Sequence, residues 1–194
     1  EFIQIRFIDY SFRKLKKVLS LLSSSNIRTI EILIPYMDED KNSALISYVE
    51  KNPRVQILYF YNSPFNKSIN KPFYFNVIYY ERNLTDEKLC GIINTDYFLI
   101  DIKNFSKSKN VNNCLKDKLF ISRNGTIKNC PSLNLEIGHI NDILIEDLYT
   151  VIEADPIRNI TKDSIEICKD CEYRYICTDC RAYLEKPSNP LSKP

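Results

Sequence analysis

Residues 29–61 read TIEILIPYMDEDKNSALISYVEKNPRVQILYFY: a β-rich run, a segment of helix length, and a second β-rich run. Pro35 stops the first run, and Asn52-Pro53 ends the segment between the two. Parallel strands need a crossover of about a dozen residues or more, which is usually a helix. A strand, a helix and a strand in this order therefore predict a βαβ unit, and with it an α/β fold with a parallel sheet.

The same alternation runs through the first eighty residues or so. Ser11 is a plausible N-cap for a helix whose apolar residues recur at helical spacing. We expect helices at Phe12–Leu22 and Asp40–Lys51, and strands at Phe2–Ile8, Thr29–Ile34, Val55–Tyr61 and Phe73–Tyr80, with a polar loop before the last strand. Four strands are too few to close a barrel. Residues 1–81 are therefore expected to form a partial parallel β/α region, half-barrel-like in architecture.

The chain changes character after this region. Residues 82–110 are less regular, with a short helix predicted at Thr85–Leu89 and a short strand at Phe98–Ile102. The polar, lysine-rich stretch Ser106–Asn110 is a natural boundary. We expect 82–110 to be a connecting segment and 111–194 to be a small cysteine-rich module with a β-hairpin and short helices.

Composition excludes several classes of function. The 194 residues carry 27 Lys+Arg and 25 Asp+Glu, which gives a formal net charge of +2. Because this charge is close to neutral, we do not expect a nucleic-acid partner. The apolar runs are too short to cross a membrane and no signal peptide begins the sequence, so we expect a cytoplasmic protein. The three glycines are isolated, which excludes dinucleotide-binding and Walker A loops. Residue 1 is Glu1, not Met, so we expect the native chain to extend upstream.

Six of the seven cysteines lie between residues 114 and 180, and four of them form Cys168-x2-Cys171-x5-Cys177-x2-Cys180. A C-x2-C turn directs two thiolates to one metal or cluster. Disulfides are not expected in a cytoplasmic chain. Zinc ribbons usually separate their two C-x2-C turns by about 15–20 residues, whereas iron–sulfur clusters tolerate close spacing. Iron–sulfur is the favoured interpretation and zinc the alternative. Cys90 is expected in the core.

A β-hairpin is predicted just before these four cysteines. Asn124-Gly125 is a strong two-residue turn signal, and it lies between β-rich segments at 117–122 and 126–130. With these two residues as the loop, the facing pairs are Arg123 with Thr126 and Leu119 with Cys130. Cys114 then lies just beyond the open end of the hairpin. Both thiols are expected near one end, as two ligands of a shared cluster or as two small buried side chains.

The cysteine spacing resembles a known pattern. Cys114-x10-Gly125-x4-Cys130, a gap and then the four clustered cysteines are similar to the SPASM domain of radical S-adenosylmethionine peptide maturases. More narrowly, ISRNGTIKNCPS at 121–132 and CKDCEYRYICTDCRAY at 168–183 resemble the grasp-with-SPASM maturases, which act beside an ATP-grasp ligase on ribosomal peptides. The resemblance covers about residues 111–194. Residues before it resemble, more weakly, the later half of a radical SAM partial barrel.

The resemblance implies two auxiliary 4Fe–4S clusters, one on Cys114, Cys130 and Cys180 and the other on Cys168, Cys171 and Cys177. It also implies a precursor peptide and an ATP-grasp ligase as partners. The final spacing here is x2 where the family has x3, and no further cysteine follows Cys180. Each cluster is therefore left with three assignable thiolates. A single cluster on the last four cysteines is the simpler alternative.

The chain lacks the C-x3-C-x2-C motif and the Gly-Gly pair that radical SAM enzymes use. We therefore do not expect this polypeptide alone to generate a radical, and no catalytic residue is assigned. The expected role is to hold auxiliary clusters and to position a precursor peptide. The alternative is a zinc-stabilised protein-interaction module without redox or catalytic activity. His139, the single histidine, is expected to be packed or at the surface, not a ligand.

Overall fold

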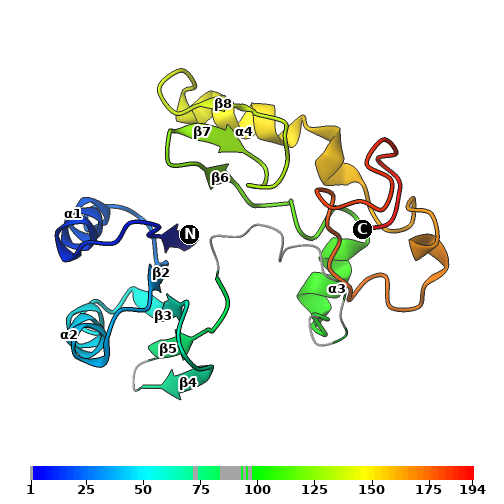
Figure 1. The fold of residues 1–194 in the computed structure, drawn as a ribbon. Helices are drawn as coiled ribbons and strands as arrows, with labels where there is room; N and C mark the ends of the chain where they lie inside the picture. Colours follow the sequence, from blue (N-terminus) through cyan, green and yellow to red (C-terminus); the bar gives the residue numbers. More distant parts are fainter. Residues whose placement is uncertain (1, 72–73, 84–92, 94, 96–97) are drawn as a thin grey trace. The chain divides into compact units, whose positions relative to one another are not determined.

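The computed structural model describes residues 2–71, 74–83, 93, 95 and 98–194. Its contacts divide the chain into two compact units, Glu1–Asp86 and Glu87–Pro194, which are described separately below (Figure 1). None of the helices within the described ranges combines the length and the apolar character needed to cross a bilayer.

The first unit is built on a five-stranded sheet in the order β1-β2-β3-β5-β4. The strands are β1 (Phe2–Arg6), β2 (Thr29–Pro35), β3 (Val55–Tyr61), β4 (Lys67–Asn70) and β5 (Asn76–Tyr79). The pairs β1–β2, β2–β3 and β3–β5 are parallel, and β4 is antiparallel to β5. The predicted α/β class with a mainly parallel sheet is confirmed.

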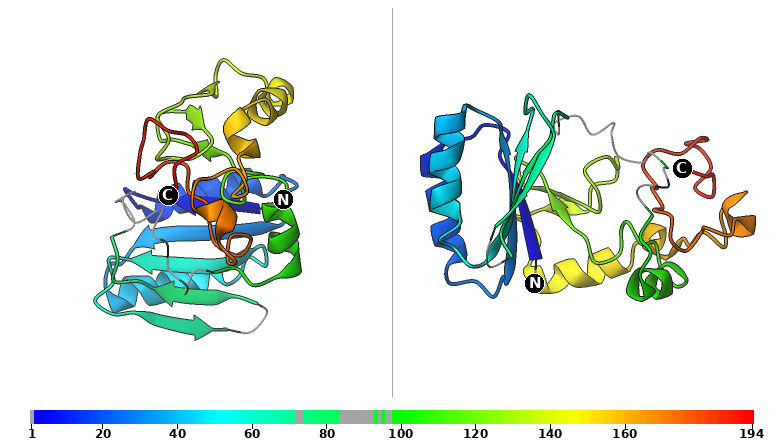
Figure 2. Two further views of the ribbon diagram at one scale, coloured as in Figure 1. Left: turned by 90° about the vertical axis from the view of Figure 1, so that its right-hand side faces the viewer. Right: turned by 90° about the horizontal axis from the view of Figure 1, so that it is seen from below.

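Two helices, α1 (Phe12–Leu22) and α2 (Glu39–Val49), cover one face of this sheet (Figure 2). Ser11 caps α1, since its Oγ accepts the backbone N–H of Lys14 at 3.2 Å. Asp38 caps α2 in the same way, accepting from Lys41 at 2.8 Å. Between the helices and the sheet lies a core of aliphatic and aromatic side chains that includes Leu15, Leu19, Ile30, Ile32, Ile34, Leu45, Val49, Leu58 and Phe60.

Strand β4 lies in the stretch for which the sequence predicts a polar loop. Its sequence KSIN contains one apolar residue and has no alternating pattern. At the edge of a sheet, polar and charged residues are favoured because they discourage further strand pairing. The predicted fourth strand is β5, which begins at Asn76; residues 72–73 and the predicted helix Thr85–Leu89 lie outside the described residues.

The second unit contains more turn than regular structure. Its elements are α3 (Ile102–Ser108), the three-stranded sheet of β6 (Phe120–Ile121), β7 (Thr126–Lys128) and β8 (Gly138–His139), α4 (Ile145–Glu153), and the 3₁₀ turns η3 (Pro156–Asn159) and η4 (Cys168–Asp170). The helix α3 lies inside the segment 82–110 that was predicted to be a connection, and it belongs to this unit.

The strand predicted at Phe98–Ile102 is wrong. Residues 98–100 have no regular structure, and Ile102 begins α3. Asp101 supplies the physical reason, because its Oδ1 accepts the backbone N–H of Asn104 at 2.8 Å. This is an N-cap, which fixes the start of a helix at the next residue.

The hairpin β6–β7 is present, but its predicted register is off by one residue. Phe120 pairs with Lys128 and Ile121 with Ile127, so Cys130 continues toward Lys118 and not toward Leu119. The loop has three residues, 123–125, and Gly125 takes φ +88° at its last position. A turn followed by a left-handed glycine is the usual three-residue hairpin loop. A Cβ on Gly125 would also lie 2.5 Å from His139 Nε2.

Candidate metal centre

All six described cysteines are thiols in the second unit. Cys177 and Cys180 are buried, Cys114, Cys130 and Cys168 are half-buried, and Cys171 is exposed. They come from three segments that are far apart in sequence: the turn after α3, the end of the hairpin, and the two C-x2-C turns. Long-range contacts between these segments therefore determine how the thiols are arranged.

The turn that carries Cys114 is organised by the buried side chain of Asn112. Its Oδ1 accepts the backbone N–H groups of Cys114 at 3.0 Å and Leu115 at 2.9 Å. Its Nδ2 donates to Oδ2 of Asp179 at 2.9 Å and to the Asp179 carbonyl at 3.3 Å. One amide thus fixes the turn and joins it to the segment between Cys177 and Cys180.

Asn113 makes a second connection between the same segments. Its Nδ2 donates to the Cys177 carbonyl at 3.2 Å, and its Oδ1 accepts the backbone N–H of Asp179 at 3.1 Å. Buried backbone groups need such partners, and here they have no helix or sheet to supply them. Asn112 and Asn113 together hold Cys114 beside the last C-x2-C turn.

Arg158 connects the hairpin to this arrangement. Its side chain is buried and donates from Nε to Asn129 Oδ1 at 2.6 Å and from Nη2 to the Lys118 carbonyl at 2.5 Å. Its own carbonyl accepts the backbone N–H of Asn112 at 2.8 Å. Since Asn129 directly precedes Cys130, Arg158 holds Cys130 and the Cys114 turn in one framework.

These contacts bring Cys130 and Cys180 into electrostatic range of Cys114. The pKa of Cys114 is raised, mainly by burial; Lys118 opposes the rise, while Cys180, Cys130 and Asp179 add to it. Cys114, Cys130 and Cys180 are the residues that the resemblance to the SPASM domain implies for one cluster. Among the residues that the structure describes, however, no three His, Cys, Asp or Glu side chains form a group that could hold a metal ion.

Cys168 and Cys177 form a second electrostatic pair. Burial raises the pKa of Cys168, Lys162 and Arg181 oppose the rise, and Asp179 and Cys177 add to it. Cys171 is joined to this group through the backbone, as its N–H donates to the Cys168 carbonyl at 3.0 Å. Asp179 acts on both Cys114 and Cys168, so its carboxylate lies within electrostatic reach of both groups of thiols.

The backbone just before Cys168 is strained. Ile167 has φ +67° and ψ −45°, and the N–H of Cys168 donates to the Glu166 carbonyl at 2.7 Å. This is a γ-turn, a conformation that is costly for a β-branched residue. Ile167 is also 66% exposed, so no burial of its side chain compensates for the strain. Such outliers concentrate at functional sites.

Two buried cations accompany the thiols. Arg181 forms an ion pair with Asp179 and donates from Nη1 to the carbonyls of Pro190 at 3.2 Å and Ser192 at 3.0 Å. Its Nε has no hydrogen-bond partner among the residues that the structure describes. Lys162 is also buried and donates to the Thr178 carbonyl at 3.0 Å. Burial raises the pKa of Asp179, whereas Arg181 and Lys162 lower it.

His139 is part of the hairpin and not of the thiol groups. Its Nε2 donates to the Asn124 carbonyl at 2.7 Å, and its Nδ1 accepts the backbone N–H of Asn141 at 3.2 Å. Both ring nitrogens are therefore used by the backbone. Cys90 lies outside the described residues.

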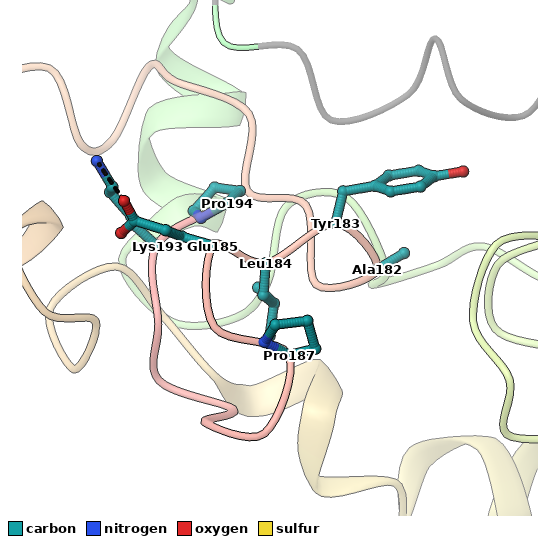
Figure 3. A pocket seen from close by; sticks show the side chains of 7 residues that line it. All are labelled: Ala182, Tyr183, Leu184, Glu185, Pro187, Lys193 and Pro194. Atoms are coloured by element: carbon teal, nitrogen blue, oxygen red, sulfur yellow. Dashed lines mark ion pairs between the residues drawn. The ribbon is translucent and has the colours of Figure 1, made fainter.

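A hollow of about 470 Å³ lies on the C-terminal loops, lined by Ala182, Tyr183, Leu184, Glu185, Pro187, Lys193 and Pro194 (Figure 3). Glu185 and Lys193 form an ion pair of 3.6 Å, and the ring of Tyr183 points away from them. The Tyr183 hydroxyl bonds Ser132 Oγ at 3.2 Å, two residues after Cys130. None of the six described cysteines lines the hollow.

No family model, curated protein or solved structure matches this chain. Function must therefore be inferred from the site itself. Sequence reasoning identified the cysteines but missed the residues that arrange them, Asn112, Asn113, Arg158 and Asp179. Their signal in the sequence was weak, because a single Asn or Arg in a turn-rich region has no distinguishing pattern.

Proposed function

We propose that the second unit binds iron–sulfur clusters through Cys114, Cys130, Cys168, Cys171, Cys177 and Cys180. The observation that carries the proposal is that side-chain contacts of Asn112 and Asn113 join the Cys114 turn to the segment of Cys177 and Cys180, and that Cys130 and Cys180, from two other segments, both lie in electrostatic range of Cys114. Scattered core cysteines would have no reason to gather in this way. The likeness of their spacing to the SPASM pattern supports the same assignment.

The chemistry around the thiols is consistent with a thiolate-bound group. Buried polar groups are nearly always hydrogen-bonded, yet the Nε of Arg181 finds no partner within the described part of the chain. Two buried cations, Lys162 and Arg181, accompany one buried carboxylate, Asp179, so this part of the interior carries excess positive charge. Thiolates with inorganic sulfide would supply both the missing negative charge and a hydrogen-bond acceptor.

In this proposal Cys114, Cys130 and Cys180 hold one cluster and Cys168, Cys171 and Cys177 the other. Bound clusters would supply electron transfer, or cross-links that stabilise the fold. The chain's own residues supply the framework: Asn112, Asn113 and Arg158 fix the separations between segments before any metal binds. The three-thiolate sets leave one further ligand position in each case.

We further propose that the chain serves peptide maturation in the cytoplasm, positioning a precursor peptide for a partner ATP-grasp ligase. This part of the proposal is supported by the resemblance of residues 121–132 and 168–183 to the grasp-with-SPASM maturases.

Anaerobic reconstitution tests the metal assignment. The full chain is incubated with ferrous iron and sulfide, desalted, and assayed for bound iron and acid-labile sulfide. We expect equal amounts of both, in multiples of about four per chain, with loss of bound iron in C168S and C114S and none in the control C90S. Uptake of one zinc per chain, with no retained iron or sulfide, would establish the zinc-stabilised module instead.

A further inference from the structure

Helix α1 of the first unit carries its charges in an order that opposes its own stability. The helix has no acidic residue, and its first half contains four cations, Arg13, Lys14, Lys16 and Lys17. The N-terminal end of a helix is the positive end of its dipole, where anionic side chains are favoured and cationic ones are not. The helices α2 and α4 have the favourable order, with acidic residues in the first turn.

Three of these cations also repel one another. Arg13 is three positions from Lys16 and four from Lys17, so they are neighbours on the helix surface, where like charges are destabilising. All three are exposed, and none has an acidic side chain of the described residues at ion-pair distance, whereas Lys14 pairs with Asp9 at 2.5 Å. This arrangement costs the folded chain stability, and such violations of local rules are expected at functional sites.

The cationic face is held in place by aromatic side chains. Phe12 and Tyr48 form an edge-to-face pair with ring centroids 4.8 Å apart, and Nζ of Lys16 lies 4.6 Å from the centroid of Phe12 and 5.5 Å from that of Tyr48. The rings fix the Lys16 ammonium group, which lowers the entropy that binding would cost. Because the Phe12 ring is engaged in these contacts, it is not free to insert into a lipid surface.

We propose that this face of α1 docks an extended acidic segment of a partner protein, whose Asp or Glu side chains pair with Arg13, Lys16 and Lys17. Residues 13–17 span only roughly 8 Å along the helix, which suits a short segment. Alternate side chains of an extended segment lie on one side, about 6.6 Å apart. This matches the spacing of about 5–6 Å between residues four apart on a helix. The inference concerns the first unit and does not depend on the iron–sulfur proposal.

The test uses the full chain and a fluorescein-labelled peptide in which Glu alternates with Ser, about ten residues long, which more than spans the face. Fluorescence anisotropy measures the affinity at low and at high ionic strength. R13Q/K17Q removes two charges from the face, and R13E/K17E reverses them. R28Q/K51Q is the matched control, because it removes two exposed charges of the first unit that lie outside α1.

We expect R13Q/K17Q to bind the peptide about fivefold more weakly than the wild type, since two surface ion pairs are lost. High ionic strength should weaken wild-type binding, and R28Q/K51Q should bind as the wild type does. R13E/K17E should instead bind the matching peptide with Lys in place of Glu, which a merely structural role would not produce. The melting temperature of R13Q/K17Q should equal or exceed that of the control, because a repulsion is removed.

Equal affinity of R13Q/K17Q and R28Q/K51Q for the acidic peptide would overturn the inference, as would a wild-type chain that does not bind the peptide. Wild-type binding to vesicles of phosphatidylserine and phosphatidylcholine, and not to the peptide, would identify a lipid surface in place of a protein partner. A melting temperature of R13Q/K17Q below that of the control would show that the cations stabilise the fold, and would overturn the inference as well.

Discussion

Asn112 donates from Nδ2 to Oδ2 of Asp179 across 2.9 Å, and so joins two residues that are 67 positions apart. This bond connects the turn of Cys114 to the loop between Cys177 and Cys180. It places a ligand candidate from the start of the second unit beside two from its end. Here a side-chain amide, and not regular secondary structure, joins the two segments.

Replacing Asn112 with Ala should destabilise the second unit. The change removes the donor to Asp179 Oδ2. It also removes the acceptor of the backbone N–H groups of Cys114 and Leu115. Leaving such buried groups unpaired costs about 1–3 kcal/mol. Urea unfolding followed by circular dichroism measures the effect. N110A is the control, because Asn110 makes a comparable side-chain bond to the Ser106 carbonyl at an exposed position. Equal stability of the two variants contradicts the role assigned to Asn112.

The strain at Ile167 predicts a substitution that stabilises the metal-free chain. Glycine adopts φ +67° without the steric penalty of a β-branched residue, so I167G should raise the free energy of unfolding by about 1 kcal/mol. Little packing is lost, since the Ile167 side chain is mostly exposed. Thermal unfolding provides the measurement.

K169G is the matched control for this prediction, because Lys169 is exposed and lies in η4, where glycine brings only an entropic cost. K169G should lower the melting temperature while I167G raises it. A loss of stability in both variants would show that the γ-turn at Ile167 carries no strain.

The raised thiol pKa values predict how metal uptake depends on pH. Burial is the main cause for both Cys114 and Cys168, whose pKa values lie above the ordinary 9.0. A raised pKa in the folded chain keeps the thiol protonated at neutral pH, and metal binding must release that proton. Affinity should therefore rise with pH from 6.5 through 8.5. The same raised pKa values affect the stability of the metal-free chain. Their contribution to the free energy of unfolding is fully present below the thiol pKa of the unfolded chain, and it is lost as the pH rises through the higher pKa of the folded chain.

Titration with Co²⁺, followed by its thiolate charge-transfer absorption, measures this dependence at several pH values. The slope of log affinity against pH should decrease in C114S and C168S, because each removes one releasable proton. An affinity that does not change with pH would mean that the thiols do not bind the metal.

Because Cys171 is exposed, its role as a metal ligand can be tested apart from any role in packing. Since its side chain is exposed, C171S should change the stability of the metal-free chain by less than about 0.5 kcal/mol. In the iron-loaded chain it should abolish the metal-dependent stabilisation of residues beyond 110, which hydrogen exchange resolves from the first unit. Retention of that stabilisation in C171S would remove Cys171 from the ligand set.

Much of the first unit follows from local pattern. Val55–Tyr61 and Phe12–Leu22 were predicted with the bounds that the structure has, because apolar periodicity and caps such as Ser11 act within a few residues. Strand β4 escaped prediction because an edge strand needs few apolar residues. The register of the hairpin was wrong by one because Gly125, not Asn124, controls the loop through its positive φ.

In the candidate site, too, the local features could be predicted from sequence and those that depend on distant contacts could not. The C-x2-C turns are local and could be read from sequence, whereas the roles of Asn112 and Lys162 depend on contacts with residues 178 and 179, far along the chain. No periodicity or spacing marks an asparagine that will cap a turn and reach a distant aspartate. Such residues become visible only once the fold has brought the segments together.

X-ray absorption at the iron and zinc edges, on chain purified anaerobically without added metal, identifies the bound metal and its neighbours. We expect bound iron whose nearest neighbours are sulfur, with a further iron–iron shell that only a cluster produces. A spectrum of single zinc ions in a sulfur shell, or a chain that contains neither metal, would contradict the iron–sulfur assignment.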